Sequence, residues 1–152
     1  MIFEGSKEKD SSSYKINIFV EDGKLISNTI EFFIDTGASI TTMSLKDAYT
    51  FNLLDIDSNT LKVINIHGLA EGGKIHTASQ TIGSLILPNT RLTFMVDETS
   101  YFVETLRYIL IVNPILNSEN YKDLLRIPSV LGLDILKNYK IQFTDNKIIL
   151  ER

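Results

Sequence analysis

The segment Phe32–Ile40 constrains the fold more than any other part of the chain. Three apolar residues are followed by Asp35 and then by small residues, in the order Phe-Phe-Ile-Asp-Thr-Gly-Ala-Ser-Ile. An ionised carboxylate directly behind an apolar strand is costly to bury unless hydrogen-bond donors surround it. Thr36 and Gly37 can supply donors, and the glycine lets the chain turn sharply around the acid. The segment therefore predicts a strand that ends in a tight loop holding a carboxylate rigidly, as acid–base catalysis requires.

The same tripeptide also has a plain interpretation. Asp-Thr-Gly is a common turn after a strand, and taken alone it does not distinguish a catalytic loop from an ordinary one. Other segments of the chain are needed to distinguish a catalytic loop from an ordinary turn.

Alternation of apolar and polar residues predicts a mostly β chain around this segment. Tyr14–Val20 has the period of a half-buried strand, Asp22 and Gly23 mark a tight turn, and Lys24–Phe33 returns as the second strand. A turn at Pro88 and Asn89 is expected to separate two later strands. All further strands are expected at Leu61–Ile66, Lys74–Gln80, Ser84–Leu87, Arg91–Val96, Lys140–Thr144 and Lys147–Leu150.

Helical patterns are few. Ser44 can cap the amide of Asp47 at the start of a short helix, and a second short helix is expected over Leu133–Tyr139. Apolar residues also recur at helical spacing after residue 100, at Phe102, Leu106, Ile109 and Leu110. With prolines at 114 and 128 as stops, this pattern predicts an insertion of one or two helices at about residues 101–126.

Length and composition limit the kinds of protein that this chain can be. Its 152 residues suggest one domain, expected at 14–152, preceded by a flexible or partly ordered arm at 1–13. There is no cysteine, which excludes disulfides, thiolate metal sites and cysteine nucleophiles. The net charge is -4 and no basic tract stands out, so no nucleic-acid partner is expected. Without a long apolar stretch or a signal-peptide core, we expect no membrane partner and a cytoplasmic location.

Two later segments place glycine beside apolar residues. The stretch His67–Gly73 is rich in glycine and is expected to form the tip of a long hairpin. Val130 and Leu131 form an apolar pair followed by Gly132, directly before the expected short helix. Each segment alone is an ordinary turn or strand-to-helix junction, so only their combination with the Asp-Thr-Gly loop is informative.

In this order and spacing, the three segments resemble the retropepsin family of aspartic proteases, which includes retroviral proteases and their cellular and prokaryotic relatives. The resemblance covers about Tyr14–Leu150, apart from the insertion. It implies a mostly β fold, namely a single-lobe acid-protease β-barrel with a flap hairpin, a short C-terminal helix and here a helical insertion. It also implies an aspartic endopeptidase that hydrolyses peptide bonds in peptide or unfolded protein substrates.

The resemblance assigns roles to individual residues. Asp35 matches the catalytic aspartate, and Thr36, Gly37 and Ala38 match the residues that support the active site. The positions that match the flap and the wall of the substrate cleft are Gly68, Leu69, Gly72, Gly73, Val130 and Leu131.

The chain holds one such loop and no internal repeat, whereas acid-protease chemistry needs two carboxylates that share a proton. A two-fold axis beside Asp35 would supply the second carboxylate from another copy, so we expect a homodimer. We also expect Lys140–Leu150 to pair with its symmetry mate. Retroviral relatives have charged residues that form salt links near the dimer interface, where this chain has Ser39, Ile40 and Leu133. The geometry of the interface therefore stays open, as do substrate preference and the role of the insertion.

Other functions have less support in the residues. A retropepsin-like module for binding or dimerisation, with weak, gated or no protease activity, stays as the alternative. His67 and His76 have no third ligand in view, so neither a metal nor another cofactor is expected. No Gly-x-Ser-x-Gly segment is present, which disfavours a serine hydrolase.

Overall fold

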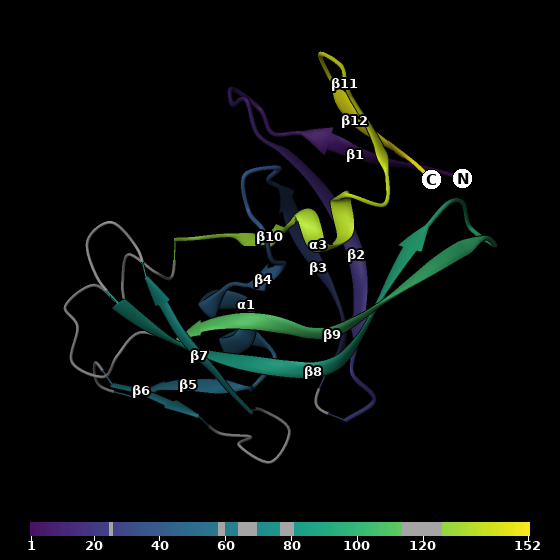
Figure 1. The fold of residues 1–152 in the computed structure, drawn as a ribbon. Coiled ribbons are helices and arrows are strands. Elements are labelled where there is room, and N and C mark those ends of the chain that lie inside the picture. Colours follow the sequence, from purple (N-terminus) through teal and green to yellow (C-terminus); the bar gives the residue numbers. More distant parts are fainter. Residues whose placement is uncertain (25, 58–59, 64–69, 77–80, 114–125) are drawn as a thin grey trace.

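The structure is a computed structural model that describes residues 1–24, 26–57, 60–63, 70–76, 81–113 and 126–152 (Figure 1). Most of these residues lie in strands, as the sequence predicts. The strands are β1 (Ile2–Lys7), β2 (Tyr14–Glu21), β3 (Ser27–Ile34), β4 (Thr42–Met43), β5 (Leu54–Asp57), β6 (Thr60–Val63), β7 (Ala70–His76), β8 (Thr81–Met95), β9 (Tyr101–Asn113), β10 (Ser129–Leu131), β11 (Lys140–Phe143) and β12 (Lys147–Glu151). The described helices are α1 (Leu45–Thr50) and α3 (Leu133–Leu136).

Six strands close into a barrel. Their order is β2-β3-β10-β4-β9-β8, and β8 pairs with β2 to complete the ring. β10 lies parallel to β3 and antiparallel to β4, so it sits between the strand that precedes the Asp-Thr-Gly loop and the strand that follows it. Beyond the barrel, β1, β12 and β11 extend from β2, and β7 extends from β8. The β-barrel expected from the sequence is therefore confirmed.

Inward-facing residues of β2 and β3 fill part of the barrel interior. The buried residues alternate along each strand, at Ile16, Ile18 and Val20 and at Ile30 and Phe32. Full burial of a side chain of this size contributes ~1.5–3 kcal/mol to folding. A shift of register by one residue would turn this whole set outward, so the apolar pattern fixes how the two strands pair.

The two short helices, α1 and α3, and the final hairpin also form as predicted. Ser44 caps α1 by accepting the N–H of Asp47 at 3.0 Å, and α3 occupies the first half of Leu133–Tyr139. β11 and β12 pair as the final hairpin. The N-terminal segment holds more structure than expected, because β1 pairs with both β12 and β2.

The helical insertion predicted at 101–126 is wrong over the part that the structure describes. Residues 101–113 form β9, which pairs with β8 on one side and with β4 on the other. Residues 114–125 lie outside the described part of the chain. Ile109, Leu110 and Ile111 are buried one after another. A strand covered on both faces gives a near-continuous apolar run, and such a run can imitate helical spacing.

The hairpins between residues 54 and 95 differ from expectation as well. β8 continues through Pro88 and Asn89 as one strand, although Asn89 has a left-handed φ of +53°. β6 pairs with β5 and β7 pairs with β8, so the two expected arms of the flap hairpin are not partners of each other in the described residues. Gly72 and Gly73 lie inside β7, beside a shift of register, rather than in a turn.

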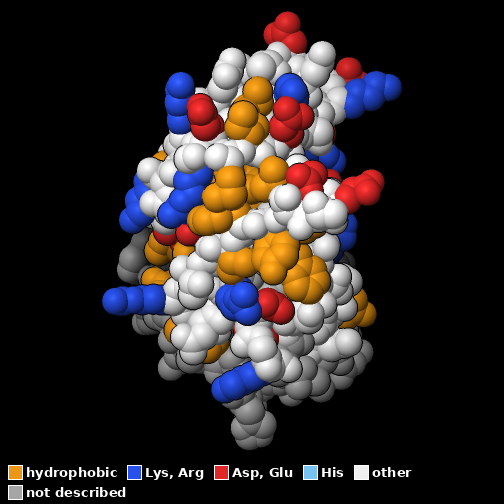
Figure 2. Space-filling model, turned by 90° about the vertical axis from the view of Figure 1, so that its right-hand side faces the viewer, with side chains coloured by type: hydrophobic (Ala, Val, Ile, Leu, Met, Phe, Trp, Pro, Cys, Tyr) orange, Lys and Arg blue, Asp and Glu red, His pale blue; other side chains and the backbone are white. Residues whose placement is uncertain are grey.

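Apolar side chains gather on the face seen in Figure 2. This face is the side of the molecule where Figure 1 places both chain ends and the β8–β9 turn. The exposed large apolar residues of these segments are Met1, Ile2, Met95, Val96 and Tyr101. Faces of this kind often contact another protein. No helix in the described residues is long and apolar enough to span a membrane.

The two chain ends are fastened to the barrel and to each other. The N–H of Arg152 donates to the carbonyl of Met1 at 2.9 Å. The Arg152 side chain forms an ion pair with Glu104 and lies 4.6 Å from the ring centre of Phe102. Glu104 is buried and accepts a 3.0 Å hydrogen bond from Tyr139, whose pKa is raised to about 12 by burial. Arg152 therefore neutralises a buried carboxylate while it holds the last strand in place.

Replacing Arg152 with alanine should destabilise the fold, because the buried side chain of Glu104 would lose its cation. We expect a loss of ~1–3 kcal/mol in the free energy of unfolding, measured by urea denaturation. The matched control is Lys140→Ala, which removes an ion pair between largely exposed groups and should leave the urea midpoint unchanged. Equal midpoints for the two variants would show that the Glu104 pair does not stabilise the barrel.

Candidate active site

The Asp-Thr-Gly loop leaves the barrel at the end of β3 and folds back on its own acid. The side chain of Asp35 is exposed, and its Oδ1 accepts the N–H of Gly37 at 2.8 Å. The carbonyl of Asp35 accepts the N–H of Ala38 at 3.2 Å. A Cβ at Gly37 would lie 3.1 Å from the same Oδ1, so a side chain there would press on the carboxylate. A larger residue here would require the carboxylate to move by a few tenths of an ångström.

β10 holds the loop from the opposite side. The N–H of Asp35 donates to the carbonyl of Leu131 at 3.3 Å, and the N–H of Leu133 donates to the carbonyl of Ala38 at 2.8 Å. Both ends of the loop are thus bonded to the segment that β10 and α3 form around Gly132. Because these bonds are made by backbone groups, the place of the carboxylate is set by the fold of the barrel.

Thr41 and Asp134 lock the two segments together, and we call this pair the Thr41–Asp134 clamp. The N–H of Thr41 lies 3.0 Å from Oδ2 and 3.1 Å from Oδ1 of Asp134, and its hydroxyl donates to Oδ1 at 2.7 Å. The same hydroxyl accepts the N–H of Gly132 at 3.0 Å. Thr41 is fully buried, and a buried polar group is costly to leave without its partner. The carboxylate of Asp134 is therefore a structural group of the loop.

Gly132 is the point where the two segments come closest. A Cβ at this position would lie 2.6 Å from the carbonyl carbon of Ile40 and 2.7 Å from its oxygen. Backbone atoms cannot yield as the end of a long side chain can, so any other residue would separate the segments. The apolar-apolar-glycine pattern of the sequence is explained by this contact.

Replacing Thr41 with valine should loosen the site while keeping the volume of the side chain. The variant loses the bond to Asp134 and leaves the buried N–H of Gly132 without its acceptor, which should cost ~1–3 kcal/mol in the free energy of unfolding. Urea denaturation would measure it. The matched control is Thr42→Val, at the neighbouring position, where the hydroxyl has no hydrogen bond within the described chain and no comparable loss is expected. A Thr41→Val protein as stable as the control would rule out the clamp.

The remaining predicted site residues have different surroundings. Thr36 is exposed beside Asp35, and Val130 is half-buried and pairs with Phe33 of β3. Leu131 has no exposed surface, so it supports the loop from the core instead of lining an open wall. Gly68 and Leu69 lie outside the described residues. Sequence reasoning missed Thr41, although its small hydroxyl side chain two residues after Ser39 was a possible signal.

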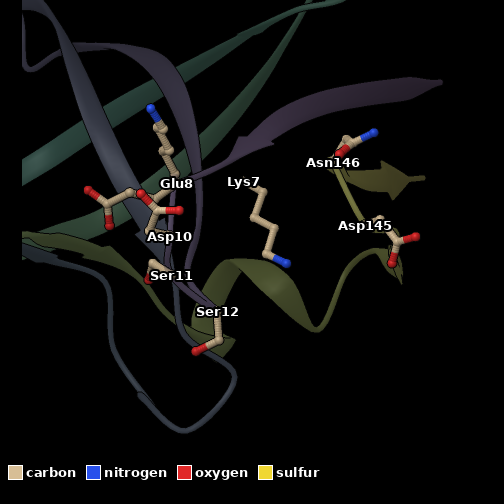
Figure 3. A pocket seen from close by; sticks show the side chains of 8 residues that line it. Lys7, Glu8, Asp10, Ser11, Ser12, Asp145 and Asn146 are labelled. Carbon is tan, nitrogen blue, oxygen red and sulfur yellow. The ribbon is translucent and has the colours of Figure 1, made fainter.

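A polar hollow lies apart from this loop, between the β1–β2 loop and the β11–β12 turn (Figure 3). Its volume is about 590 Å³, and charged or polar residues such as Lys7, Asp10 and Asp145 line it. It shares no residue with the Asp35 loop. Within the described ranges, no three His, Cys, Asp or Glu residues lie close enough to hold a metal ion. His76 ends β7, and His67 is outside those ranges.

The family model described as "gag-polyprotein putative aspartyl protease" matches residues 22–138, which include the Asp35 loop, β10 and α3. The chain belongs to this family. Membership in an aspartyl protease family supports a general aspartyl protease function for the chain.

A solved structure supports the fold of this aspartyl protease family member. The crystal structure of a retropepsin-like aspartic protease from Rickettsia conorii is similar with a TM-score of 0.53 and 18% sequence identity. The likeness covers 99% of this chain and 89% of that one. At this identity it concerns the fold, which is retropepsin-like as the sequence predicts. No curated protein matches the chain.

Proposed function

We propose that the chain is an aspartic endopeptidase that acts as a homodimer, with one Asp35 from each subunit. The observation that carries this proposal is the Asp35 loop, in which an exposed carboxylate is held by a backbone N–H at 2.8 Å in a member of an aspartyl protease family. Retropepsin-like proteases generally act as dimers on peptide substrates. One loop in a chain without a repeat is half of such a site, so a second copy has to supply the other half.

The surface beside the loop supports a contact between two copies. Leu133 is 40% exposed although its N–H is bonded to the carbonyl of Ala38 in the loop. An exposed leucine at this place offers an apolar contact where retroviral relatives have a charge. β11 is the end strand of the ten-stranded sheet, so one edge of Lys140–Phe143 is available for the expected pairing. A dimer built from these contacts should respond weakly to salt, because few charges take part.

In the proposed mechanism the two Asp35 carboxyl groups share one proton. The ionised group takes a proton from a water molecule, whose oxygen attacks the carbonyl carbon of the peptide bond. The protonated group donates its proton to the carbonyl oxygen, which gives a gem-diol. The group that took the proton from water then gives it to the nitrogen, one hydroxyl of the gem-diol returns its proton to the other Asp35, and the C–N bond breaks as the carbonyl re-forms. The Gly37 N–H and the bonds to β10 keep each carboxyl in place, so little reorganisation is needed during the reaction.

Asp35→Asn should lower peptide cleavage at least about a hundredfold while the fold is kept, because an amide of nearly equal shape cannot shuttle the proton.

Mixing wild-type subunits with Asp35→Asn subunits tests the dimer. A tenfold excess of Asp35→Asn subunits should reduce wild-type activity to about a tenth, since about one wild-type subunit in eleven keeps a wild-type partner. An equal excess of Asp10→Asn, which changes an exposed residue of the β1–β2 loop outside the expected pairing, should raise total activity instead. Full activity of a 17.2 kDa monomer in light scattering would end the proposal.

Cleavage should be fastest at acidic pH and should fall toward neutrality. A pair of carboxyl groups about 3 Å apart works only when it holds one proton, and the pair loses that proton as the pH rises. Cleavage of an unfolded protein across pH 3 to 8 would measure this, with and without a chelator, which should have no effect. A flat profile through pH 8, or loss of activity with the chelator, would point to different chemistry.

A further inference from the structure

Three residues join the start of β10 to the start of α1 in a closed ring of hydrogen bonds. The hydroxyl of Ser129 donates to Oδ2 of Asp47 at 2.5 Å and accepts the N–H of Ser44 at 2.9 Å. The ring closes through α1, where the N–H of Asp47 donates to the Ser44 hydroxyl at 3.0 Å. We call these residues the Ser44–Asp47–Ser129 ring. Because the Ser129 hydroxyl serves both as donor and as acceptor, its orientation is fixed.

The ring is shielded from water and anchored in the core. Ser129 is 1% exposed and Ser44 is also buried, so water cannot readily replace their bonds. Hydrogen bonds from a hydroxyl to a carboxylate are short and among the stronger ones in proteins. On the side of α1, Leu45 and Ala48 are buried in the core and hold the helix there. The ring therefore fastens the first residue of β10 to an anchored helix.

β10 is a short strand between β3 and β4 (Figure 1). It pairs with β3 over Ser129–Leu131 and with β4 at Val130. Its last residue supports the catalytic loop, because the Leu131 carbonyl accepts the N–H of Asp35 at 3.3 Å. At ~3.3 Å per residue, about 7 Å separates Ser129 from Leu131. A shift of β10 along β3 would therefore move the carbonyl on which the Asp35 loop rests.

We propose that Ser129 is a positioning residue for Asp35, which acts through the Leu131 carbonyl and touches no substrate. The proposal rests on the proposed protease function, because it assigns Ser129 a role in the reaction of the Asp35 pair. Two carboxyl groups that share a proton have to meet within hydrogen-bond reach. A displacement of about 1 Å in such a site can cost a hundredfold in rate. The ring restrains β10 at the end opposite to the Thr41–Asp134 clamp, so the strand is held at both ends.

Ser129→Ala removes the donor to Asp47 and the acceptor of the Ser44 N–H. It should lower kcat about tenfold and leave KM within about twofold of wild type, because it shifts the reacting groups more than the peptide contacts. Steady-state cleavage of one fluorogenic peptide that the wild-type protein cleaves measures both constants. The matched control is Thr50→Ala, which removes a hydroxyl bond to the Lys46 carbonyl in α1 and should keep the wild-type kcat. Wild-type kcat in Ser129→Ala protein would overturn the proposal.

A pair of substitutions at Asp47 tests the ring without changing a fully buried residue. Asp47 is half-buried, and its backbone N–H can keep the bond to Ser44 in either variant. Asp47→Asn retains a side-chain oxygen that accepts the Ser129 hydroxyl, so kcat should stay within about twofold of wild type. Asp47→Ala has no acceptor, and its kcat should fall as in Ser129→Ala. Equal kcat values for the two Asp47 variants would contradict the proposal, and this comparison decides if Ser129→Ala does not fold.

Amide hydrogen exchange separates this inference from the proposed function. The N–H groups of Asp35 and Leu133 form the backbone bonds between the loop and the segment around β10. In Ser129→Ala protein they should exchange about tenfold faster than in Thr50→Ala protein, as followed by NMR. Faster exchange in a chain whose wild type cleaves nothing supports the positioning of Asp35 and rejects the protease function alone. Unchanged exchange at both groups overturns the positioning role, whatever the cleavage assay shows.

Discussion

The contact between Thr41 and Asp134 is the interaction on which the site depends. It joins the segment after the Asp35 loop to the start of α3, and through Gly132 it also joins β10. Without it, the loop would be held to the segment around Gly132 by backbone bonds alone, of 2.8–3.3 Å. Because Thr41 is buried, water cannot replace its lost hydrogen-bond partners, and the loop would lose the stabilisation that these bonds give. A buried threonine and a carboxylate therefore determine how rigidly an exposed acid is held.

The barrel explains why the acid itself is exposed. β3, β10 and β4 lie side by side in the closed wall, and the loop between β3 and β4 leaves that wall at its rim. Backbone groups of β10 occupy the inner side of the loop, which directs Asp35 away from the core. A lone carboxylate cannot act as acid and base together, as a pair that shares one proton can. In the proposed mechanism a second copy covers the loop, and the apolar surface of Leu133 beside it is suited to such a contact.

The sequence predicted the features that depend on local chemistry. The Asp-Thr-Gly loop, the cap at Ser44, the β2–β3 hairpin and α3 follow from residues close to one another in the chain, and the structure contains all four. The prediction failed where partners are distant. β9 is a strand because it pairs with β8 and β4. Its buried residues are consecutive, so the sequence lacks the alternation of apolar and polar residues that would indicate a strand. The partner of β7 could not be inferred either, because several glycines near residue 70 made a turn there equally reasonable.

The short strand β10 connects the cap of α1 to the Thr41–Asp134 clamp. Its first residue, Ser129, accepts the N–H of Ser44, the cap of α1, and its last residue is followed by Gly132 at the clamp. Only two residues lie between Ser129 and Gly132, so the two contacts are at opposite ends of one three-residue strand. A change that displaces Ser129 must therefore also displace the carbonyl of Leu131, which accepts the N–H of Asp35. For this reason, the packing of β10 on α1 and the position of the acid are properties of one structural unit in this fold.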